Sequence, residues 1–152
     1  MNEIPQVLFK NRHPGETVFL DGYRKSGGYE GAKKALTSMS PSEVRETVKA
    51  SGLRGRGGAG FPTGVKWTFF PSDQLGEKYL VCNADEMEPG TYKDRELLLA
   101  DPHQLVEGMI VSAYAMRIPV GYIFIRYAYE RCAQNLERAI AEAREEIGRA
   151  HV

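Results

Sequence analysis

Two short apolar segments, separated by a capped helical pattern, constrain the fold of this chain most strongly. The first, residues 78–83, is a continuous apolar run of the kind typical of a buried strand. An Asp-Pro helix start at residues 101–102 follows, and an apolar, aromatic segment at residues 120–127 predicts a second strand. A long amphipathic pattern over residues 130–147 predicts the last helix. This order favours an α/β fold with a Rossmann-like parallel sheet, right-handed crossovers and flanking helices.

The first third of the chain predicts helices in front of this α/β pattern. Residues up to about Tyr23 are expected to be irregular, because proline and glycine interrupt them. Apolar residues at helical spacing over residues 29–39 predict a short amphipathic helix. Residues 40–43 are Ser-Pro-Ser-Glu, a capping box that opens a second helix, and Gly52 is expected to end it. No internal repeat or low-complexity linker is visible, so we expect one domain.

The most unusual segment is residues 52–67, which holds six glycines in sixteen positions. Glycine lets the backbone adopt positive φ and approach an anion closely, so that successive N–H groups can converge on a phosphate. Pro62 and Thr63 can start a short helix whose N-terminus adds to this attraction, and Lys66 adds a mobile positive charge. The aromatic residues of this run argue against a plain mobile loop, which is normally rich in serine.

A dinucleotide-binding turn is the obvious interpretation of these glycines, and we reject it. Gly55, Gly57 and Gly60 match the spacing G-x-G-x-x-G. That fingerprint requires a strand in front of it, whereas a capped helix precedes it here. The Walker pattern fails as well, because Phe61 stands where its lysine would follow. A phosphate-binding loop of another kind is therefore predicted, with a plain surface loop as the alternative.

An acidic segment, residues 83–96, follows the first predicted strand. Ligands of parallel α/β sheets bind beyond the carboxyl ends of the strands, where this segment begins. Its carboxylates and amide can accept hydrogen bonds from ribityl hydroxyls, ribose hydroxyls or ring N–H groups. An exposed turn closed by a Pro-Gly pair is the alternative. A glycosidase with paired carboxylates is rejected, because nothing else in the sequence indicates a sugar cleft.

Composition excludes several classes of function. Lys+Arg and Asp+Glu balance at 20 each, so no nucleic acid or anionic membrane is indicated as a partner. The longest apolar segment is interrupted by Arg117 and Pro119 and is too short to span a bilayer. Cys82 and Cys132 are too far apart for a local metal-binding pair. A reducing, cytoplasmic setting is the expectation.

Two segments together resemble a known family. They are G-L-R-G-R-G-G-A-G-F-P-T-G-V-K-W at residues 52–67 and Y-L-V-C-N-A-D-E-M-E-P-G-T-Y-K-D-R at residues 79–95. They resemble the flavin- and NADH-binding subunits of respiratory complex I, and Met87 and Tyr92 resemble the bacterial form. The resemblance runs from about Leu20 to the end of the chain. It implies the amino-terminal portion of a complex I flavoprotein-type FMN-binding domain, with FMN as prosthetic group and NADH as electron donor.

The resemblance also implies roles for individual residues. Those expected at FMN contact its phosphate, its ribityl chain or its ring: Gly55, Arg56, Gly57, Gly58, Gly60, Lys66, Asn83, Asp85 and Glu86. Those expected at NADH are Phe61 and Phe69, by stacking, and Glu88, by hydrogen bonding. No side chain is expected to act as a catalytic acid or base, because hydride transfer between two oriented rings requires none.

The function implied is that of an NADH dehydrogenase (quinone) flavoprotein subunit. Such a protein accepts hydride from NADH onto FMN and passes electrons to the iron–sulfur clusters of the respiratory chain. The expected partners are NADH and other hydrophilic subunits of a multi-subunit oxidoreductase. The expected place is cytoplasmic and peripheral to the inner membrane, without direct insertion.

The resemblance leads us to expect that residues 1–152 form the amino-terminal portion of such a domain, with the family's ubiquitin-like and iron–sulfur domains absent from these residues. Two cysteines cannot supply the four ligands of a 4Fe-4S cluster, so that cluster is expected only downstream of this chain. Alternative functions are a flavoprotein (diaphorase) subunit of an NAD-reducing hydrogenase or of an NAD-dependent formate dehydrogenase. A truncated non-catalytic fragment and a phosphate-binding module unrelated to redox chemistry are further alternatives.

Overall fold

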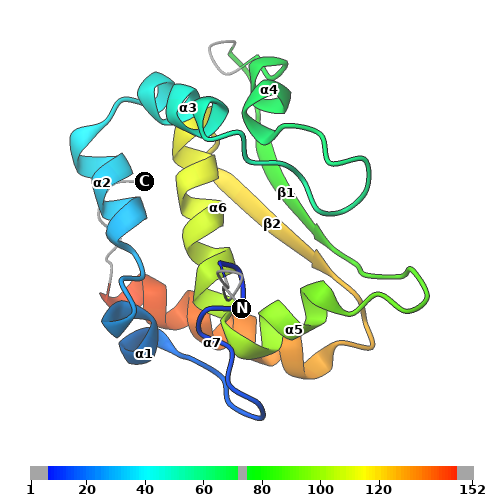
Figure 1. The fold of residues 1–152 in the computed structure, drawn as a ribbon. Coiled ribbons are helices and arrows are strands. Elements are labelled where there is room, and N and C mark those ends of the chain that lie inside the picture. Colours follow the sequence, from blue (N-terminus) through cyan, green and yellow to red (C-terminus); the bar gives the residue numbers. More distant parts are fainter. Residues whose placement is uncertain (1–6, 72–74, 147–152) are drawn as a thin grey trace, which may run out of the picture. The chain divides into compact units, whose positions relative to one another are not determined.

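The structure is a computed structural model that describes residues 7–71 and 75–146 (Figure 1). Its helices and strands, in chain order, are α1 (Leu20–Lys25), α2 (Glu30–Ser38), α3 (Pro41–Ala50), α4 (Thr63–Thr68), β1 (Tyr79–Ala84), α5 (Lys93–Ala100), α6 (Pro102–Met116), β2 (Val120–Ile125) and α7 (Glu130–Glu146). The order strand, helices, strand, helix confirms the predicted α/β class. The last predicted helix is also confirmed, and its predicted end at residues 147–148 lies outside the described residues.

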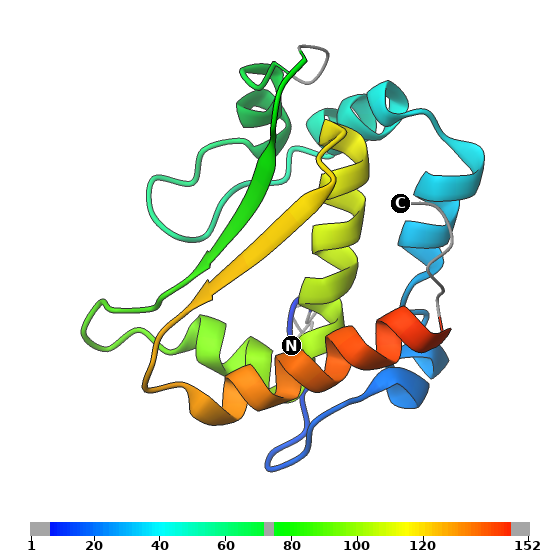
Figure 2. The same cartoon turned by 180° about the vertical axis from the view of Figure 1, so that it is seen from behind.

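Strands β1 and β2 pair with each other and run in the same direction (Figure 2). Parallel neighbours need a crossover connection, and α5 and α6 provide it. Side chains alternate along β1: Leu80 packs into a core, whereas Tyr79 and Val81 are 49% and 61% exposed. The prediction of a strand buried on both faces was therefore wrong for one face. On β2, Tyr122 and Phe124 are also exposed.

The chain forms two compact units, each with its own core. Unit 1 comprises Met1–Tyr29, Cys82–Gly108 and Ile123–Val152, and unit 2 comprises Glu30–Val81 and Met109–Tyr122. Because β1, α6 and β2 each run through both units, the two units share their central elements.

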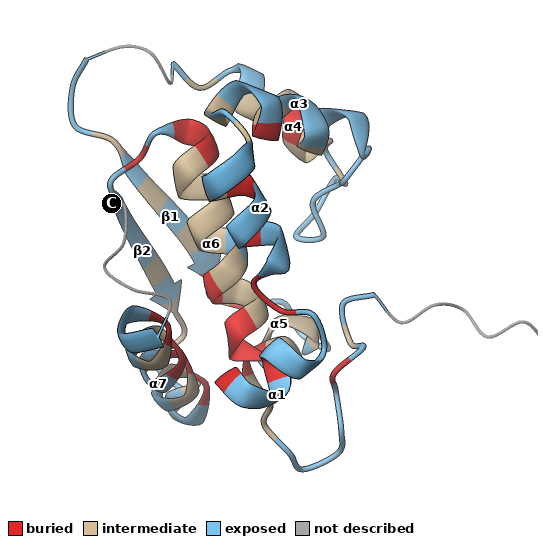
Figure 3. Cartoon of the chain, turned by 90° about the vertical axis from the view of Figure 1, so that its left-hand side faces the viewer, coloured by how far each residue is buried: buried red, intermediate tan, exposed pale blue. Residues whose placement is uncertain are grey.

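The core of unit 1 joins the end of β1 to α5 and α7, which lie side by side (Figure 2). Its buried members are Ala84, Leu98, Cys132 and Leu136. Figure 3 shows the buried residues of α7 along one side of the helix, as its amphipathic pattern predicts. Cys132 is 2% exposed and packs within this core.

A buried polar network surrounds His103 in unit 1. Its Nδ1 lies 2.7 Å from the hydroxyl of Tyr29, and its Nε2 lies 2.9 Å from a carboxylate oxygen of Glu142. The backbone N–H of Tyr29 and the hydroxyl of Tyr23 both donate to Glu107. Burial, and then the charge of Glu107, raise the pKa of Tyr29 well above its ordinary value, so the phenol stays protonated. His103 is thus a structural residue of this unit.

Unit 2 is built around α3 and the second half of α6. The predicted capping box is present: Ser40 Oγ accepts from Glu43 N at 3.3 Å, and the Glu43 carboxylate accepts from Ser40 N at 2.7 Å. Val44 of α3 lies in the core, and Trp67 and Phe70 pack against it. The aromatic residues at the end of the glycine-rich run therefore divide between core and surface.

Two helices were not predicted. Helix α1 begins inside the segment expected to be irregular, and its first N–H group, that of Leu20, donates to Glu142 on α7 at 3.1 Å. Helix α5 begins within the acidic segment of residues 83–96, for which no helix was predicted, and the carboxylate of Glu86 accepts from the N–H groups of Asp94 and Arg95 in its first turn. Both helix starts use a carboxylate from elsewhere in the chain, so neither carries a local capping pattern.

Candidate functional site

The glycine-rich run forms a closed loop between α3 and α4. Gly55 N donates to Phe61 O at 3.0 Å, Thr63 N donates to Leu53 O at 2.8 Å, and Arg54 and Pro62 form an antiparallel bridge. These bonds tie the two ends of the loop together. Residues 56–59 between them are exposed, and their N–H groups make no hydrogen bond within the described part of the chain. The loop therefore presents a short row of free backbone donors.

The fold requires glycine at some positions of this loop and not at others. Gly60 has φ +66°, which favours glycine, and Gly64 is buried against α3. A Cβ added at Gly64 would lie 2.2 Å from Lys49 Cα, which no side chain can occupy. Gly57 and Gly58 have neither positive φ nor any atom within 4 Å of an added Cβ. The chain's own fold thus requires glycine at positions 60 and 64 but not at positions 57 and 58.

Two phenylalanines of unit 2 form an exposed pair next to this loop. The ring centroids of Phe61 and Phe69 lie 6.2 Å apart at an interplanar angle of 46°, and the residues are 49% and 71% exposed. The predicted helix start is present as α4, which carries Lys66 with an exposed side chain. The structure therefore brings the predicted loop, cation and aromatic residues together within one unit. Because α4 has only six residues, its dipole adds little to the attraction for an anion.

The acidic segment belongs to unit 1 and begins at the last two residues of strand β1. The side-chain oxygen of Asn83 accepts from Asp85 N at 3.0 Å, which folds the backbone around the end of the strand. Asp85 keeps 19% of its side chain exposed, with Arg126 at 4.0 Å. Glu88 is exposed at the head of a turn in which Thr91 N donates to Glu88 O at 3.0 Å. These side chains are available to a ligand on this unit.

Glu86 differs from its acidic neighbours because it is buried. Its side chain is 2% exposed and accepts from Asp94 N at 2.9 Å and from Arg95 N at 3.2 Å. Burial alone raises the pKa of Glu86, but the two N–H groups, with Lys93 and Tyr129, outweigh burial and hold it below its ordinary value. The carboxylate is therefore ionised at neutral pH and engaged within the chain.

The two free cysteines do not form a reactive site. Burial, and then the charge of Asp94, raise the pKa of the Cys82 thiol, so little thiolate forms at neutral pH. Among the described residues, no group of His, Cys, Asp and Glu side chains is arranged to hold a metal ion. Within the same part of the chain, no helix has the length and apolar character to cross a bilayer.

Comparison with known proteins identifies the family. Residues 48–152 match the family model described as the Nuo51 FMN-binding domain. The chain belongs to this FMN-binding domain family. Its relatives include the F subunit of the NADH-quinone oxidoreductase of Escherichia coli (strain K12), 55% identical over 144 residues, which are 94% of this chain and 32% of the relative. The corresponding protein of Aquifex aeolicus (strain VF5) is 50% identical over 138 residues, 91% of this chain and 32% of the relative.

A solved structure shows the same fold. It is an NAD⁺-reducing [NiFe]-hydrogenase in the air-oxidised state, similar with a TM-score of 0.64 and 38% identity. The similarity covers 77% of this chain and 23% of that chain. This chain spans about a third of the length of the curated relatives that it matches.

The structure of this FMN-binding family member adds residues that the sequence did not indicate. Tyr129, at the start of α7, has its hydroxyl 3.3 Å from both the backbone oxygen and the carboxylate of Glu86. Arg126, in the same connection, lies near Asp85. Each lies about forty positions from its acidic partner in sequence, and no spacing pattern links the two.

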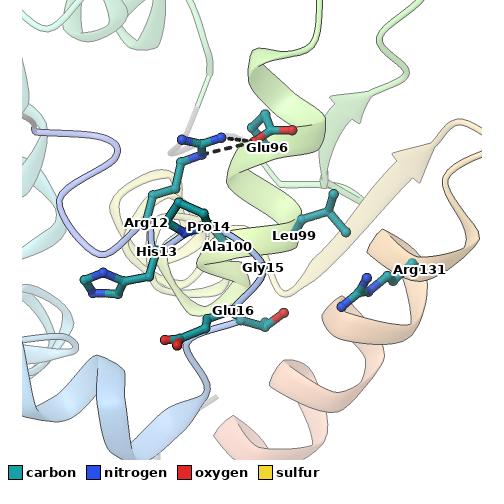
Figure 4. A pocket seen from close by; sticks show the side chains of 10 residues that line it. Arg12, His13, Pro14, Gly15, Glu16, Glu96, Leu99, Ala100 and Arg131 are labelled. Carbon is teal, nitrogen blue, oxygen red and sulfur yellow. Dashed lines mark hydrogen bonds and ion pairs between the residues drawn. The ribbon is translucent and has the colours of Figure 1, made fainter.

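A separate cavity of about 160 Å³ lies in unit 1 of this FMN-binding chain, between the segment before α1 and helix α5 (Figure 4). None of the residues predicted to bind FMN or NADH lines it. Arg12 on its wall is neutralised by Glu96, whose carboxylate lies 2.6 Å from the guanidinium. Glu16 and Arg131 also line the cavity, so charges of both signs surround it.

Proposed function

We propose that this chain supplies the FMN- and NADH-binding part of an NADH-quinone oxidoreductase flavoprotein subunit. The observation that carries the proposal is that the fold of the chain does not itself require glycine at Gly57 or Gly58. A Cβ at either position would occupy open space beside free backbone N–H groups. A bound phosphate needs that space for close approach, so the loop fits the phosphate of FMN.

At the phosphate end, the N–H groups of the glycine loop are the proposed donors. Gly55, Arg56, Gly57, Gly58 and Gly60 form the loop that surrounds the anion and the ribityl chain. Lys66 is exposed on α4 and adds a charge-assisted hydrogen bond. Because the loop's ends are tied by backbone bonds, its donors are ordered before a ligand arrives.

At the ring and ribityl end, the proposed contacts come from the acidic segment. Asn83 and Asp85 have exposed polar atoms that can meet ribityl hydroxyls and ring N–H groups. Glu86 was predicted for the same set, but its carboxylate already accepts from N–H groups of α5, so it is not proposed as a direct contact to FMN. Bound FMN would supply the acceptor for a hydride and the means to pass electrons on one at a time.

For NADH, the proposed contacts are the exposed pair Phe61 and Phe69 and the exposed carboxylate of Glu88. The rings can stack on nicotinamide or adenine, and the carboxylate can accept from ribose hydroxyls. These residues orient the dinucleotide and exclude water. No side chain needs to donate or accept a proton for hydride transfer.

The proposed setting is a multi-subunit oxidoreductase at the cytoplasmic side of the inner membrane, without membrane insertion of this chain. Electrons would leave toward iron–sulfur clusters outside this chain, with other hydrophilic subunits as partners. A diaphorase subunit of an NAD-reducing hydrogenase is the second candidate. It is favoured by the TM-score of 0.64 with the hydrogenase structure, although the relatives from the quinone oxidoreductases are more similar in sequence.

The experiment uses a completed subunit, in which this chain replaces the matching third of the E. coli relative and the protein is purified in its complex. We expect FMN to copurify at one per complex and NADH to reduce ferricyanide. Gly57→Ala should release FMN, whereas Gly108→Ala, which also adds a Cβ in open space, should retain it. ATP binding without any FMN would instead support the phosphate-binding module and would contradict the proposal. The two redox candidates are separated by testing whether the completed subunit supports NADH-dependent reduction of quinone or instead exchanges electrons with hydrogenase subunits.

A further inference from the structure

The side chain of Glu86 closes a loop that carries Glu88 at its exposed tip. The bond from Asp94 N to Glu86 Oε1 measures 2.9 Å and joins residues eight positions apart. Arg95 N donates to the second oxygen at 3.2 Å. Inside the closed loop, Thr91 N donates to Glu88 O, and Gly90 at φ +79° completes the turn. The position of Glu88 relative to the end of β1 therefore depends on Glu86.

A second element holds the same carboxylate. The hydroxyl of Tyr129 lies 3.3 Å from both the backbone oxygen and Oε2 of Glu86. The Tyr129 ring packs against the core of unit 1, and the Arg95 guanidinium lies 5.8 Å from the centre of that ring. Lys93 Nζ lies 4.0 Å from Oε1. Glu86 thus connects the end of β1, the start of α5 and the start of α7 within one unit.

These contacts leave the carboxylate little capacity for a ligand. With 2% of its side chain exposed, Glu86 is covered by the chain itself, and both of its oxygens already accept hydrogen bonds. Glu88 is exposed, and Asp85 keeps 19% of its side chain exposed; within the described part of the chain, neither has a comparable set of donors. The acidic segment therefore contains two kinds of carboxylate, one that faces inward and others that can face a ligand.

We propose that Glu86 is a positioning residue that holds the loop carrying Glu88, and that the Tyr129 hydroxyl completes its support. This inference rests on the proposed function, because it assigns to Glu88 the contact with NADH. It predicts that damage to this support alters the binding of NADH while FMN stays bound, because the contacts proposed for the FMN phosphate lie in the glycine loop of unit 2.

The test uses Glu86→Gln, Tyr129→Phe and the double variant in the completed subunit. Each single variant should raise the KM for NADH about fivefold, the effect of weakening one ordinary hydrogen bond, with kcat changed less than about twofold. The double variant should be no worse than the worse single variant, because both act through one contact. Hydrogen exchange at the N–H groups of Asp94 and Arg95 should rise about tenfold in Glu86→Gln.

The matched control is Glu96→Gln. Glu96 lies on the same helix and pairs with Arg12 on the surface, outside the closed loop. This variant should leave KM, kcat and FMN content unchanged. A rise in KM with Glu96→Gln as large as with Glu86→Gln would show a general disturbance of α5 and would overturn the positioning role.

Three other outcomes overturn the inference, and they are distinguishable. If Glu86→Gln releases FMN or shifts the visible flavin spectrum while Tyr129→Phe changes nothing, Glu86 contacts the flavin directly. If exchange at Asp94 rises but the KM for NADH is unchanged in both single variants, the contact is merely structural. If the unsubstituted completed subunit binds no FMN and oxidises no NADH, the proposed function is wrong. The present inference is then wrong as well, because it rests on that function.

Discussion

Replacing Gly64 by alanine should separate α4 from α3 and weaken the fold of unit 2. The added Cβ would lie 2.2 Å from Lys49 Cα and 2.5 Å from Lys49 N. Ordinary van der Waals contact requires about 3.4 Å or more, so α4 has to move by about 1 Å or more. Overpacking of this kind costs about 2 kcal/mol, and the movement displaces Lys66 on the same helix.

Trp67 is a suitable probe because it is the one tryptophan of the sequence and packs against the core of unit 2. Urea unfolding of the 152-residue chain, followed by Trp67 fluorescence, should show a lower midpoint for Gly64→Ala. Gly57→Ala is the matched control and should leave the midpoint unchanged, because its Cβ meets nothing.

A double variant tests the cause of this loss. The nearest atoms belong to the backbone of Lys49, so Lys49→Ala should not restore the stability lost in Gly64→Ala. Rescue by Lys49→Ala would show that the clash is with a side chain. An unchanged midpoint in Gly64→Ala would refute the close approach of α3 and α4 altogether.

Three further predictions concern charge and hydrogen bonding. Because the pKa of Glu86 is lowered by folding, its contribution to stability is present at neutral pH and is lost as the pH falls from about 4.3 through its folded value. The difference in urea stability between the unsubstituted chain and Glu86→Gln should therefore be larger at pH 7 than near pH 3, and a larger difference at the lower pH would contradict this sign. In the completed subunit, Lys66→Ala should weaken FMN retention about tenfold, whereas Glu88→Gln should raise the KM for NADH with FMN still bound; the reverse pattern would refute the division of roles. His103→Ala should cost about 3 kcal/mol in urea unfolding, because it removes the buried partner of Glu142, and a loss below about 1 kcal/mol would contradict the importance of that network.

Much of the fold could be predicted from local patterns. Ser40 and Glu43 complete a capping box within four residues, and the buried face of α7 follows helical periodicity. Helices α1 and α5 could not be predicted in this way. Their first N–H groups bond to Glu142 and Glu86, which are close in space but lie outside the helix being capped.

The candidate site shows the same division between local and distant causes. Gly57 and Lys66 stand in a segment whose composition indicates phosphate binding, and the structure gives that segment a closed loop with free donors. The sequence could not separate Gly64, which serves helix packing, from Gly57, because only contact with Lys49 distinguishes them. Nor could it separate buried Glu86 from exposed Glu88, because the burial of Glu86 depends on α5 and on Tyr129 beside α7.

If Gly57 and its neighbours bind the phosphate of FMN, a comparison of FMN with riboflavin should show it. Riboflavin has the same ring and ribityl chain without the phosphate. Equilibrium fluorescence titration of the FMN-depleted completed subunit should show much tighter binding of FMN than of riboflavin. Gly57→Ala should weaken FMN binding and leave riboflavin binding unchanged, so that the difference narrows. Equal weakening of both ligands, or no change in either, would contradict the proposal.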